Sequence, residues 1–445
     1  MNEELDQILI DSSHPDWHAK LREIHAAVRW ATYFEDGSDE DNQLNEILRK
    51  VKDRRIGNEA IKEYTEKFDG ARLTPDQFLV PPEDLGEAHK KIDPELLTSL
   101  RKSIENVRKY QKEIFIDNKN THLGIKYTPV KRVGICVPGA SAPLPSTVIM
   151  TAVPAQVAGV KEIVVVSPPR YKGSIHPVIL AVCYELRIDE VYRIGGSQAV
   201  AALAFGTQTI TPVNKIVGPG NQWVQMAKRK VFGVVDVDSV AGPSEVLIIA
   251  NEKANPAWVA ADMLSQAEHA PGSAVVFTDS QNFAQRTLEA LKEQVNELSR
   301  KEATIKCLLK FGAIIVFENI DEVIRHSDIF APEHLEIQCG DESKKISDQI
   351  ENAGAIFIGD YSPVAVGDYW AGPSHTLPTG QTAKFFSALS ANDFIKSTSI
   401  IEYDKKKLAE SAEDIIRLAE AEGLDAHAKS VRIRQEPRKA GTQQD

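Results

Sequence analysis

The chain has 445 residues and a formal net charge of −12 at pH 7. Hydrophobic residues make up 42% of it and charged residues 26%, which is ordinary for a globular protein. This length exceeds what one hydrophobic core supports, so two or more lobes are expected. The negative charge argues against a general binder of nucleic acids or membrane surfaces, because both classes need basic patches.

Neither a secretory signal nor a membrane span is expected. The N-terminal residues MNEELDQILI lack a basic segment, and no stretch reaches about 18 uninterrupted apolar residues. The cysteines lie far apart and form no CxxC pair, so a disulfide framework or a cysteine-type zinc site is not indicated. We therefore expect a cytoplasmic protein with four reduced thiols, which are Cys136, Cys183, Cys307 and Cys339.

Helices are predicted at both ends of the chain. Residues 1 to about 130 are mostly helical in pattern, and the segment 93–114 has apolar residues at helical spacing after an aspartate N-cap and a proline. The segment 404–423 has an aspartate start and a glycine stop, and a short helix is expected around 426–434.

From about residue 130, short apolar runs alternate with helical patterns, which predicts parallel sheets built from βαβ units. Ligands collect beyond the carboxyl ends of such strands, so the loops after these runs are candidate sites. The predicted strands are EIVVVSPP (162–169), EVYRIGG (190–196), KIVGPG (215–220), EVLIIA (245–250), AVVFTD (274–279), AIIVFE (313–318) and AIFIGD (355–360).

The predicted fold class is α/β, with two Rossmann-like lobes on parallel-type sheets and small helical pieces at the N- and C-terminal ends. The first lobe is expected to be discontinuous and to comprise 31–137 with 246–390. The second lobe is expected to comprise 138–245. Residues 1–30 would form an N-terminal helical segment, and 391–445 would form a helical C-terminal tail.

Two segments combine residue types that hold metals or move protons. In LSQAEHAPG, Gln266 and His269 are three apart near a predicted helix end, so they share a face and could reach one metal ion. The alternative is a surface glutamine with a histidine that favours the helix dipole. In APEHLEI, Glu333 and His334 are adjacent, as suits a proton-transfer pair, although a lone Glu-His dipeptide is usually an exposed turn.

Two later segments present further candidates. The segment 359–383 is rich in Gly and Pro, is predicted to be a long loop after a strand, and presents Asp368 and His375 as a metal ligand and a hydrogen-bonding group. In AEGLDAHAKSVRIR, Glu422 precedes a helix-ending glycine and His427 lies one turn into the next helix. The alternatives are a connecting loop and a histidine on the surface of an amphipathic helix.

Three glycine-rich segments follow or end apolar runs, and their backbone amides could cradle phosphate: 133–147, 195–206 and 217–223. The usual GxGxxG dinucleotide fingerprint is absent. Ser244 of AGPSEV stands in a tight turn before a strand, but there is no GxSxG nucleophile elbow, so a turn residue is the simpler interpretation.

Together these segments resemble the histidinol dehydrogenase family, from about residue 20 to 434. The motifs AGPSEV, MLSQAEH and APEHL carry the resemblance, with a GDY whose Asp precedes a His by seven residues and a terminal GLDAH. The resemblance implies an enzyme of amino-acid biosynthesis that oxidises L-histidinol through histidinal to L-histidine, a four-electron oxidation that uses two NAD. It also implies one Zn²⁺ per subunit and a homodimer with shared active sites.

The resemblance assigns roles residue by residue, with zinc and catalysis in the first lobe and NAD in the second. Glu333 and His334 would be the catalytic acid–base pair. The zinc ligands would be Gln266, His269, Asp368 and, borrowed from the other subunit, His427. The substrate contacts would be Ser244, Gln266, His269, His334, Asp368, His375, Glu422 and His427. The NAD contacts would be Cys136, Gln198 and Asn221.

The chain departs from the family pattern near these sites. Cys136 stands where a tyrosine beside the cofactor is usual, Ser374 where an asparagine is usual, and Gln381 where a glycine is usual. We expect Ser374 and Gln381 to lie near the substrate, so a related small alcohol such as a sulfonated propanediol stays open as an alternative substrate. Glu422 favours a cationic substrate, because a carboxylate repels a sulfonate.

Two other classes stay open as alternatives. In a zinc hydrolase, Glu333 would activate water and no NAD would be used, but the glycine-rich segments, Gln198 and Asn221 count against it. A non-catalytic zinc-binding protein is disfavoured by the intact pair of Glu333 and His334.

Overall fold

The computed structural model describes residues 2–14, 16–28, 37–116, 124–139, 143–268 and 271–436. The chain forms two compact units. The larger unit consists of Met1–Phe115 and Pro129–Lys396, and the smaller unit consists of Ile116–Thr128 and Ser397–Asp445.

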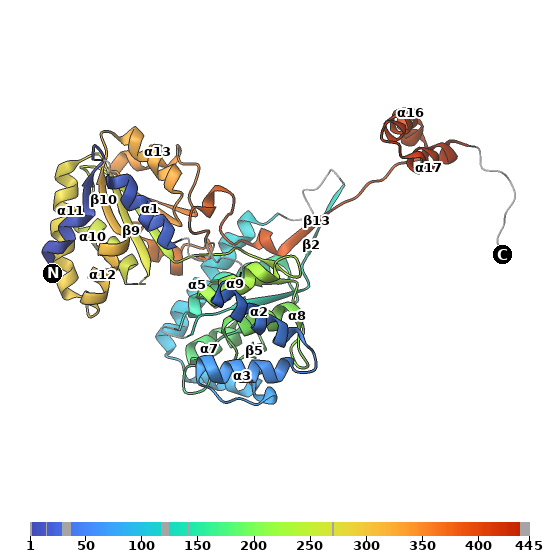
Figure 1. Ribbon diagram of the computed structural model, residues 1–445, viewed down its shortest axis with the longest axis horizontal. Coiled ribbons are helices and arrows are strands. Elements are labelled where there is room, and N and C mark those ends of the chain that lie inside the picture. The colour runs from blue at the N-terminus through green and yellow to red at the C-terminus, as the bar shows by residue number, and fades with distance from the viewer. Residues whose placement is uncertain are drawn as a thin grey trace. The chain divides into compact units, whose positions relative to one another are not determined.

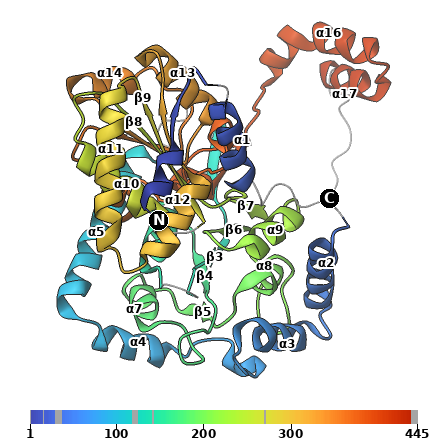
Figure 2. The same ribbon diagram turned by 60° about the vertical axis from the view of Figure 1, so that its left-hand side comes forward.

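One half of the larger unit is a five-stranded parallel sheet covered by helices on both faces, which we call the five-strand lobe (Figures 1 and 2). The strand order is β5-β4-β3-β6-β7, so the chain reverses its direction of travel across the sheet between β3 and β6. The strands are β3 (Arg132–Cys136), β4 (Glu162–Val166), β5 (Glu190–Tyr192), β6 (Lys215–Val217) and β7 (Asp236–Val237). One face packs on α4 (Pro82–Lys91), α5 (Pro94–Ile114), α6 (Pro145–Ala158) and α7 (Pro177–Glu185). The other face packs on α2 (Asp39–Lys52), α3 (Gly57–Asp69), α8 (Gly196–Phe205) and α9 (Gln222–Val231).

The other half is a six-stranded parallel sheet with its own helices, the six-strand lobe, ordered β1-β10-β9-β8-β11-β12. Its strands are β1 (Leu9–Asp11), β8 (Ser244–Ala250), β9 (Gly272–Thr278), β10 (Gly312–Val316), β11 (His334–Gln338) and β12 (Ala355–Ile358). The helices are α1 (Asp16–Val28), α10 (Pro256–Ala267), α11 (Gln281–Gln294), α12 (Lys301–Phe311), α13 (Ile320–Phe330), α14 (Ser343–Ser347) and α15 (Val364–Tyr369). Short 3₁₀ helices complete the unit at Asn2–Ile8, Pro75–Gln77, Val295–Glu297, Gly340–Glu342, Thr382–Lys384 and Ala391–Phe394.

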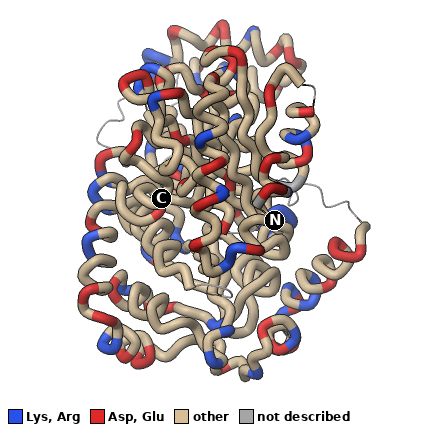
Figure 3. The backbone as a smooth tube through the Cα atoms, turned by 90° about the vertical axis from the view of Figure 1, so that its left-hand side faces the viewer, with Lys and Arg blue, Asp and Glu red and all other residues tan. Residues whose placement is uncertain are grey.

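Strand alternation explains why both sheets need helices on each side. Successive residues of a strand point to opposite faces, so an apolar run supplies two cores at once. In β8, Val246 and Ile248 pack beneath α10, while Leu247 and Ile249 pack on the other face with Leu335 of β11. The charged residues mostly follow the surrounding helices (Figure 3). None of the described helices is long and apolar enough to cross a membrane.

The α/β fold class is confirmed, and the seven predicted strands correspond to β4, β5, β6, β8, β9, β10 and β12. The structure differs from the expected lobe assignment in two places. Residues 37–115 pack on the five-stranded sheet, where Leu44 of α2 and Leu100 of α5 enter its two cores. The N-terminal segment is not purely helical, because β1 pairs with β10 at the sheet edge. An amphipathic helix shows that it needs a partner surface but not which sheet provides it.

The smaller unit contains two helices, α16 (Lys405–Ala421) and α17 (Asp425–Gln435), close to the predicted limits. Asp404 caps α16 by accepting a hydrogen bond from the backbone N–H of Lys407, and Gly423 adopts the left-handed conformation after α16. The connecting segments include β2 (Ile125–Pro129), which pairs with β13 (Ile395–Ser399). The buried residues of these two helices are three alanines and Val431. The larger apolar side chains of Leu418 and Ile433 are 67% and 58% exposed.

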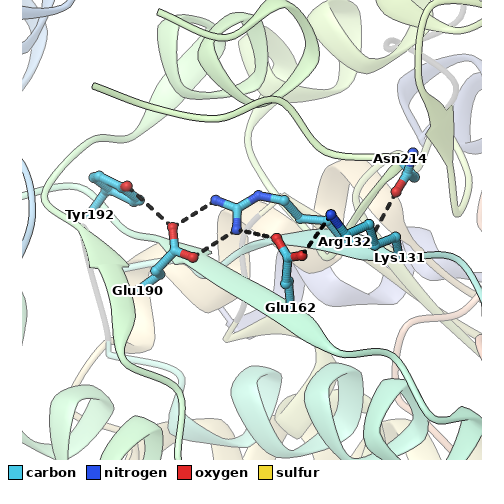
Figure 4. A network of polar contacts seen from close by, with 6 residues as sticks. All are labelled: Lys131, Arg132, Glu162, Glu190, Tyr192 and Asn214. Atoms are coloured by element: carbon cyan, nitrogen blue, oxygen red, sulfur yellow. Dashed lines mark hydrogen bonds and ion pairs between the residues drawn. The ribbon is translucent and has the colours of Figure 1, made fainter. Parts of the chain in front are cut away.

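At the amino edge of the five-stranded sheet, an ion-pair network joins three strands (Figure 4). Arg132 of β3 donates to both carboxylate oxygens of Glu190 in β5, at 2.7 and 2.6 Å, and to Glu162 in β4 at 3.1 Å. The Arg132 side chain is only 6% exposed, so its charge depends on these partners. The backbone N–H of Arg132 also donates to the side chain of Asn214, next to β6.

Replacing Arg132 with alanine is expected to lower the free energy of unfolding by about 2 kcal/mol, because two partly buried carboxylates lose their charged donor. Urea unfolding followed by circular dichroism measures this loss. Lys131→Ala is the matched control, since its ion pair with Glu162 involves a lysine that is 79% exposed and should contribute less than about 1 kcal/mol. Equal losses in the two variants would contradict the role given to Arg132.

Candidate active site

A cavity of about 530 Å³ lies between the two lobes of the larger unit, and we call it the inter-lobe pocket. The six-strand lobe contributes the starts of β8 and β11, together with the ends of α10 and α15. The five-strand lobe contributes the loops after β6 and β7 and the start of α6. The residues of the predicted site that line it are Ser244, Gln266, Glu333, His334, Asp368 and His375.

The pocket meets the two sheets at opposite kinds of edge. Gly218 follows β6, so the five-stranded sheet presents its carboxyl ends, as expected for parallel sheets. Ser244 and His334 are the first residues of β8 and β11, so the six-stranded sheet presents its amino ends. The expectation that ligand sites follow the predicted strands therefore fails for the six-strand lobe, whose site residues precede its strands.

Glu333 is held by a reciprocal clamp with Glu245, the second residue of β8. The backbone N–H of Glu245 donates to Oε2 of Glu333 at 2.8 Å, and the backbone N–H of Glu333 donates to Oε2 of Glu245 at 3.3 Å. The hydroxyl of Ser244 also donates to Oε2 of Glu333, at 2.6 Å. Because Glu333 is 7% exposed, these donors stabilise a carboxylate that burial would otherwise penalise.

The surroundings of His334 define its tautomer. Nδ1 lies 2.9 Å from the backbone carbonyl of Glu245, and because a carbonyl only accepts, Nδ1 carries the proton. Nε2 of the neutral ring is then an acceptor, and this buried atom has no hydrogen-bond partner among the described residues. Burial lowers the pKa of His334, although nearby Asp368 partly opposes this effect. His334 therefore presents a basic nitrogen to the pocket at neutral pH.

Two of the expected zinc ligands line the same pocket. Oδ1 of Asp368 lies 3.9 Å from Nε2 of His334, and burial raises the pKa of Asp368 to about 6. Gln266, in the last turn of α10, is 5% exposed, and its amide nitrogen has no hydrogen-bond partner in the described structure. A cation would satisfy the desolvated carboxylate of Asp368, and Gln266 would bind such an ion through its amide oxygen.

The other two expected ligands lie outside the described part of the larger unit. His269 lies outside the described residues, and His427, like Glu422, belongs to the smaller unit and is exposed. Within the described ranges, no group of three or more His, Cys, Asp or Glu side chains is arranged to hold a metal ion. Gln266 and Asp368 are therefore an incomplete set of metal ligands within the described structure.

His375 follows α15 in the segment that we expected to be a long loop, and that segment contains α15 itself. Nε2 of His375 lies 3.5 Å from the hydroxyl of Thr147. Burial, with a smaller contribution from the neighbouring His334, lowers the pKa of His375 to about 4, so the ring is neutral at pH 7. The neutral ring can therefore donate a hydrogen bond to a ligand or accept one from it.

A second cavity, of about 640 Å³, lies at the carboxyl ends of β3, β4, β5 and β6, and we call it the strand-end pocket. It sits where the chain reverses between β3 and β6, the position at which doubly wound sheets bind nucleotides. Gly195 and Gly196 begin α8 at its wall, so backbone N–H groups of a helix N-terminus are available to an anion. Leu144 and Pro219 line both pockets, so the two cavities are neighbours.

The three expected NAD contacts all line the strand-end pocket. Gln198 is 1% exposed, and neither polar atom of its side chain has a hydrogen-bond partner among the described residues. Asn221 caps α9 by accepting a hydrogen bond from the backbone N–H of Val224 at 3.3 Å. Cys136 ends β3, and burial raises the pKa of its thiol to about 12. A buried amide with both ends unpaired fits a pocket that is completed by a polar ligand.

The side chains of the two other departures from the family pattern donate hydrogen bonds to backbone carbonyls. Ser374 is 2% exposed, and its hydroxyl donates to the backbone carbonyl of Met150 at 2.9 Å. Gln381 donates to the backbone carbonyl of Ile329 at 3.0 Å. Neither side chain is part of the pocket lining. Ser374 immediately precedes His375, which lines the pocket, so the expectation that these two residues lie near the substrate stays a prediction.

Comparison with known proteins identifies the family. A family model for histidinol dehydrogenase matches residues 34–435. The chain is 47% identical to histidinol dehydrogenase of Rhodopirellula baltica over 386 residues, which cover 85% of this chain and 84% of the relative. It is also 47% identical to the enzyme of Oceanobacillus iheyensis over 399 residues, with 88% and 93% coverage.

The chain belongs to the histidinol dehydrogenase family. Its fold matches the crystal structure of histidinol dehydrogenase from Elizabethkingia anophelis with a TM-score of 0.86 and 34% identity, covering 96% of this chain and 97% of that one. It is accordingly an oxidoreductase of the histidinol dehydrogenase type, and the resemblance read from its motifs is confirmed.

Sequence reasoning missed three carboxyl groups at the site of this histidinol dehydrogenase family member. Glu245 clamps Glu333, and Asp262 and Glu336 line the inter-lobe pocket. A charged residue inside an otherwise apolar strand or helix pattern was the signal that could have indicated these groups. Glu245 and Glu336 each occupy such a position and are 1% exposed.

Asp368→Asn is expected to stabilise the metal-free protein at pH 8 by about 1 to 3 kcal/mol. The pKa of Asp368 is raised from 3.8 to about 6 in the folded state. Folding is therefore penalised once both states are ionised, above about pH 6, and the penalty fades as the pH falls toward 4. Thermal unfolding of chelator-treated protein at pH 5 and pH 8 measures the difference. The exposed Asp341→Asn is the control, and a destabilised Asp368→Asn at pH 8 contradicts the prediction.

Proposed function

We propose that the protein catalyses the zinc-dependent, NAD-linked oxidation of L-histidinol through histidinal to L-histidine, a step of histidine biosynthesis, in the cytoplasm. One structural observation carries the proposal. His334 presents an unpartnered basic nitrogen in a pocket that shares a wall with a second pocket at the switch point of a parallel sheet. A proton acceptor beside a nucleotide-type pocket is the arrangement that hydride transfer from an alcohol needs.

In the first half-reaction, Nε2 of His334 takes the proton of the substrate hydroxyl while a hydride leaves the carbon for NAD, which gives the aldehyde and NADH. The other ring nitrogen of His334, Nδ1, donates to the backbone carbonyl of Glu245, which keeps Nδ1 protonated and the ring oriented. The lowered pKa of His334 ensures that the neutral base predominates at pH 7.

In the second half-reaction, Glu333 takes a proton from the water that adds to the aldehyde, and the resulting hydrate loses a second hydride to another NAD. Ser244 and the backbone N–H of Glu245 both donate to Oε2 of Glu333, so the carboxylate has a defined orientation beside the pocket. His334 again accepts the hydroxyl proton, which yields the acid and a second NADH.

Gln266, His269 and Asp368, completed by His427 of the partner subunit, would hold the zinc. Bound zinc would supply a template that orients the imidazole and amine of the substrate. The desolvated carboxylate of Asp368 supports this assignment, and Gln266, which lines the same pocket, would bind through its amide oxygen. Ser244 and His375 line the same pocket and would contact the substrate, and Glu422 would suit its cationic end.

The strand-end pocket would bind NAD. The N-terminus of α8 suits the pyrophosphate, Gln198 would find the polar partners that it lacks, and Asn221 and Cys136 would contact the nucleotide. Because Leu144 and Pro219 line both pockets, the nicotinamide ring would reach the substrate across this shared boundary.

A homodimer with exchanged tails would explain the smaller unit. Two helices cannot bury enough apolar surface to be stable alone, and Leu418, Leu424 and Ile433 remain exposed at 67%, 40% and 58%. Packing on a partner subunit would cover these side chains. The same packing would bring Glu422 and His427 to the partner's inter-lobe pocket.

Zinc-loaded protein is expected to form two NADH per L-histidinol, measured as absorbance at 340 nm, and chelation should abolish the signal. His334→Ala should slow turnover by about a hundred- to ten-thousand-fold, because a general base is lost. Its zinc content should be unchanged, since His334 is not among the proposed ligands. If wild-type protein shown to contain zinc forms no NADH from histidinol, the substrate assignment is wrong. Other small alcohols would then be assayed.

Shared active sites predict complementation between two inactive variants. His334→Ala and His427→Ala, unfolded and refolded together, should regain about a quarter of wild-type activity, because half of the random dimers carry one site with no defect. Each variant treated alone is the control. Failure to regain activity, with mixed dimers demonstrated by differently tagged chains, means that His427 does not act across the interface.

A further inference from the structure

Behind the inter-lobe pocket, two carboxyl groups meet between α10 and β11. Glu336 follows His334 by two residues in β11, so both side chains lie on the same face of the strand. Asp262 precedes Gln266 by one turn of α10, so these two side chains share a helix face. Both carboxyl groups line the pocket wall, and none of the proposed catalytic steps uses either of them.

The contacts of this pair reach both elements that carry the proposed zinc ligands. Oε1 of Glu336 accepts a hydrogen bond at 3.0 Å from the backbone N–H of Val364, the first residue of α15. The amide of Gln338 donates to Oδ2 of Asp262 at 2.9 Å and to Oε2 of Glu336 at 3.0 Å. The carboxyl groups of Asp262 and Glu336 also hydrogen-bond to each other.

A direct hydrogen bond between two carboxyl groups requires a shared proton. Burial raises the pKa of Glu336 well above its ordinary value, and the Asp262 carboxylate raises it further. Burial also raises the pKa of Asp262, which the hydrogen bond from Glu336 partly offsets. Burial therefore favours a proton held between the two carboxyl groups.

We propose that Asp262 and Glu336 are positioning residues that hold α10 and α15 at the spacing at which Gln266 and Asp368 can bind one zinc ion. The inference rests on the proposed zinc site, and it concerns how the larger unit preorganises that site. Glu336 anchors the first residue of a helix whose fifth residue is Asp368. Asp262 ties the same group to the helix whose last turn contains Gln266.

The energetic cost of the pair argues for a role beyond stability. Replacing a buried polar cluster with apolar side chains of similar volume is often neutral or stabilising. Here α10 already packs on the sheet through Val259, Ala260 and Met263, so hydrophobic contacts suffice to hold it. A polar anchor adds a fixed orientation to a short helix, which apolar contacts define less closely.

The test compares three variants of the full chain. Glu336→Ala removes all three hydrogen bonds of this carboxyl group. Glu336→Asp keeps the carboxyl group but shortens its reach, and Glu336→Gln keeps the length and an acceptor for the N–H of Val364. Ile337→Val is the matched control, because it loosens the opposite face of the same strand, where Ile337 packs away from the pocket.

Two readouts decide the proposal. Amide hydrogen exchange of Val364–Tyr369 is measured on chelator-treated protein, and zinc affinity is measured by competition with a chromogenic chelator. Glu336→Ala and Glu336→Asp should accelerate exchange in this segment and weaken zinc binding by about 10- to 100-fold. Glu336→Gln should remain within a few-fold of wild type in both readouts, and Ile337→Val should change neither.

Unchanged exchange in Val364–Tyr369 for both Glu336→Ala and Glu336→Asp overturns the positioning role. Faster exchange with unchanged zinc affinity overturns it as well, because the anchor would then not serve the metal. Wild-type protein that binds no zinc is a different outcome, since it overturns the zinc site of the proposed function and, with it, the purpose assigned to the anchor. In that case the exchange data still show whether Glu336 orders α15.

Discussion

The parallel pairing of β8 with β11 is the constraint on which the geometry of the candidate site depends. Its register places His334 opposite Val246, so the backbone of Glu245 lies where it can bond to both residues of the Glu333–His334 pair. One peptide N–H orients the carboxylate and the carbonyl of the same residue selects the histidine tautomer. A slip of the pairing by one residue would separate these groups, because alternate residues face opposite sides of the sheet.

Burial shifts the pKa values of several groups at this site, and the direction of each shift depends on the charge of the ionised form. It raises the pKa of Asp368 and lowers the pKa values of His334 and His375, so in each case it favours the neutral form. The pocket thus disfavours isolated charge of either sign. A cation bound beside Asp368 reverses that preference locally, because the carboxylate then gains a partner for its charge.

Much of the architecture could be predicted because it is encoded locally. Apolar runs mark β4, β9 and β10, and Asp93 and Asp404 mark helix starts, so these elements were found with their boundaries nearly correct. β11 was missed, since Glu336 and Gln338 interrupt its apolar pattern and become buried only through partners distant in sequence. The adjacency of Glu333 and His334 indicated proton transfer, but Glu245 lies 88 residues before Glu333, and no local pattern reveals that contact.

The buried thiol of Cys136 has a chemical consequence for its neighbourhood. The strand-end pocket that it lines adjoins the inter-lobe pocket, where the proposed reaction generates an aldehyde. Thiolates add readily to aldehydes, whereas thiols are poor nucleophiles, and a pKa of about 12 keeps this sulfur protonated at physiological pH. A thiol held protonated in this way is a weak trap for a carbonyl group, so the aldehyde of the proposed reaction would remain available to water.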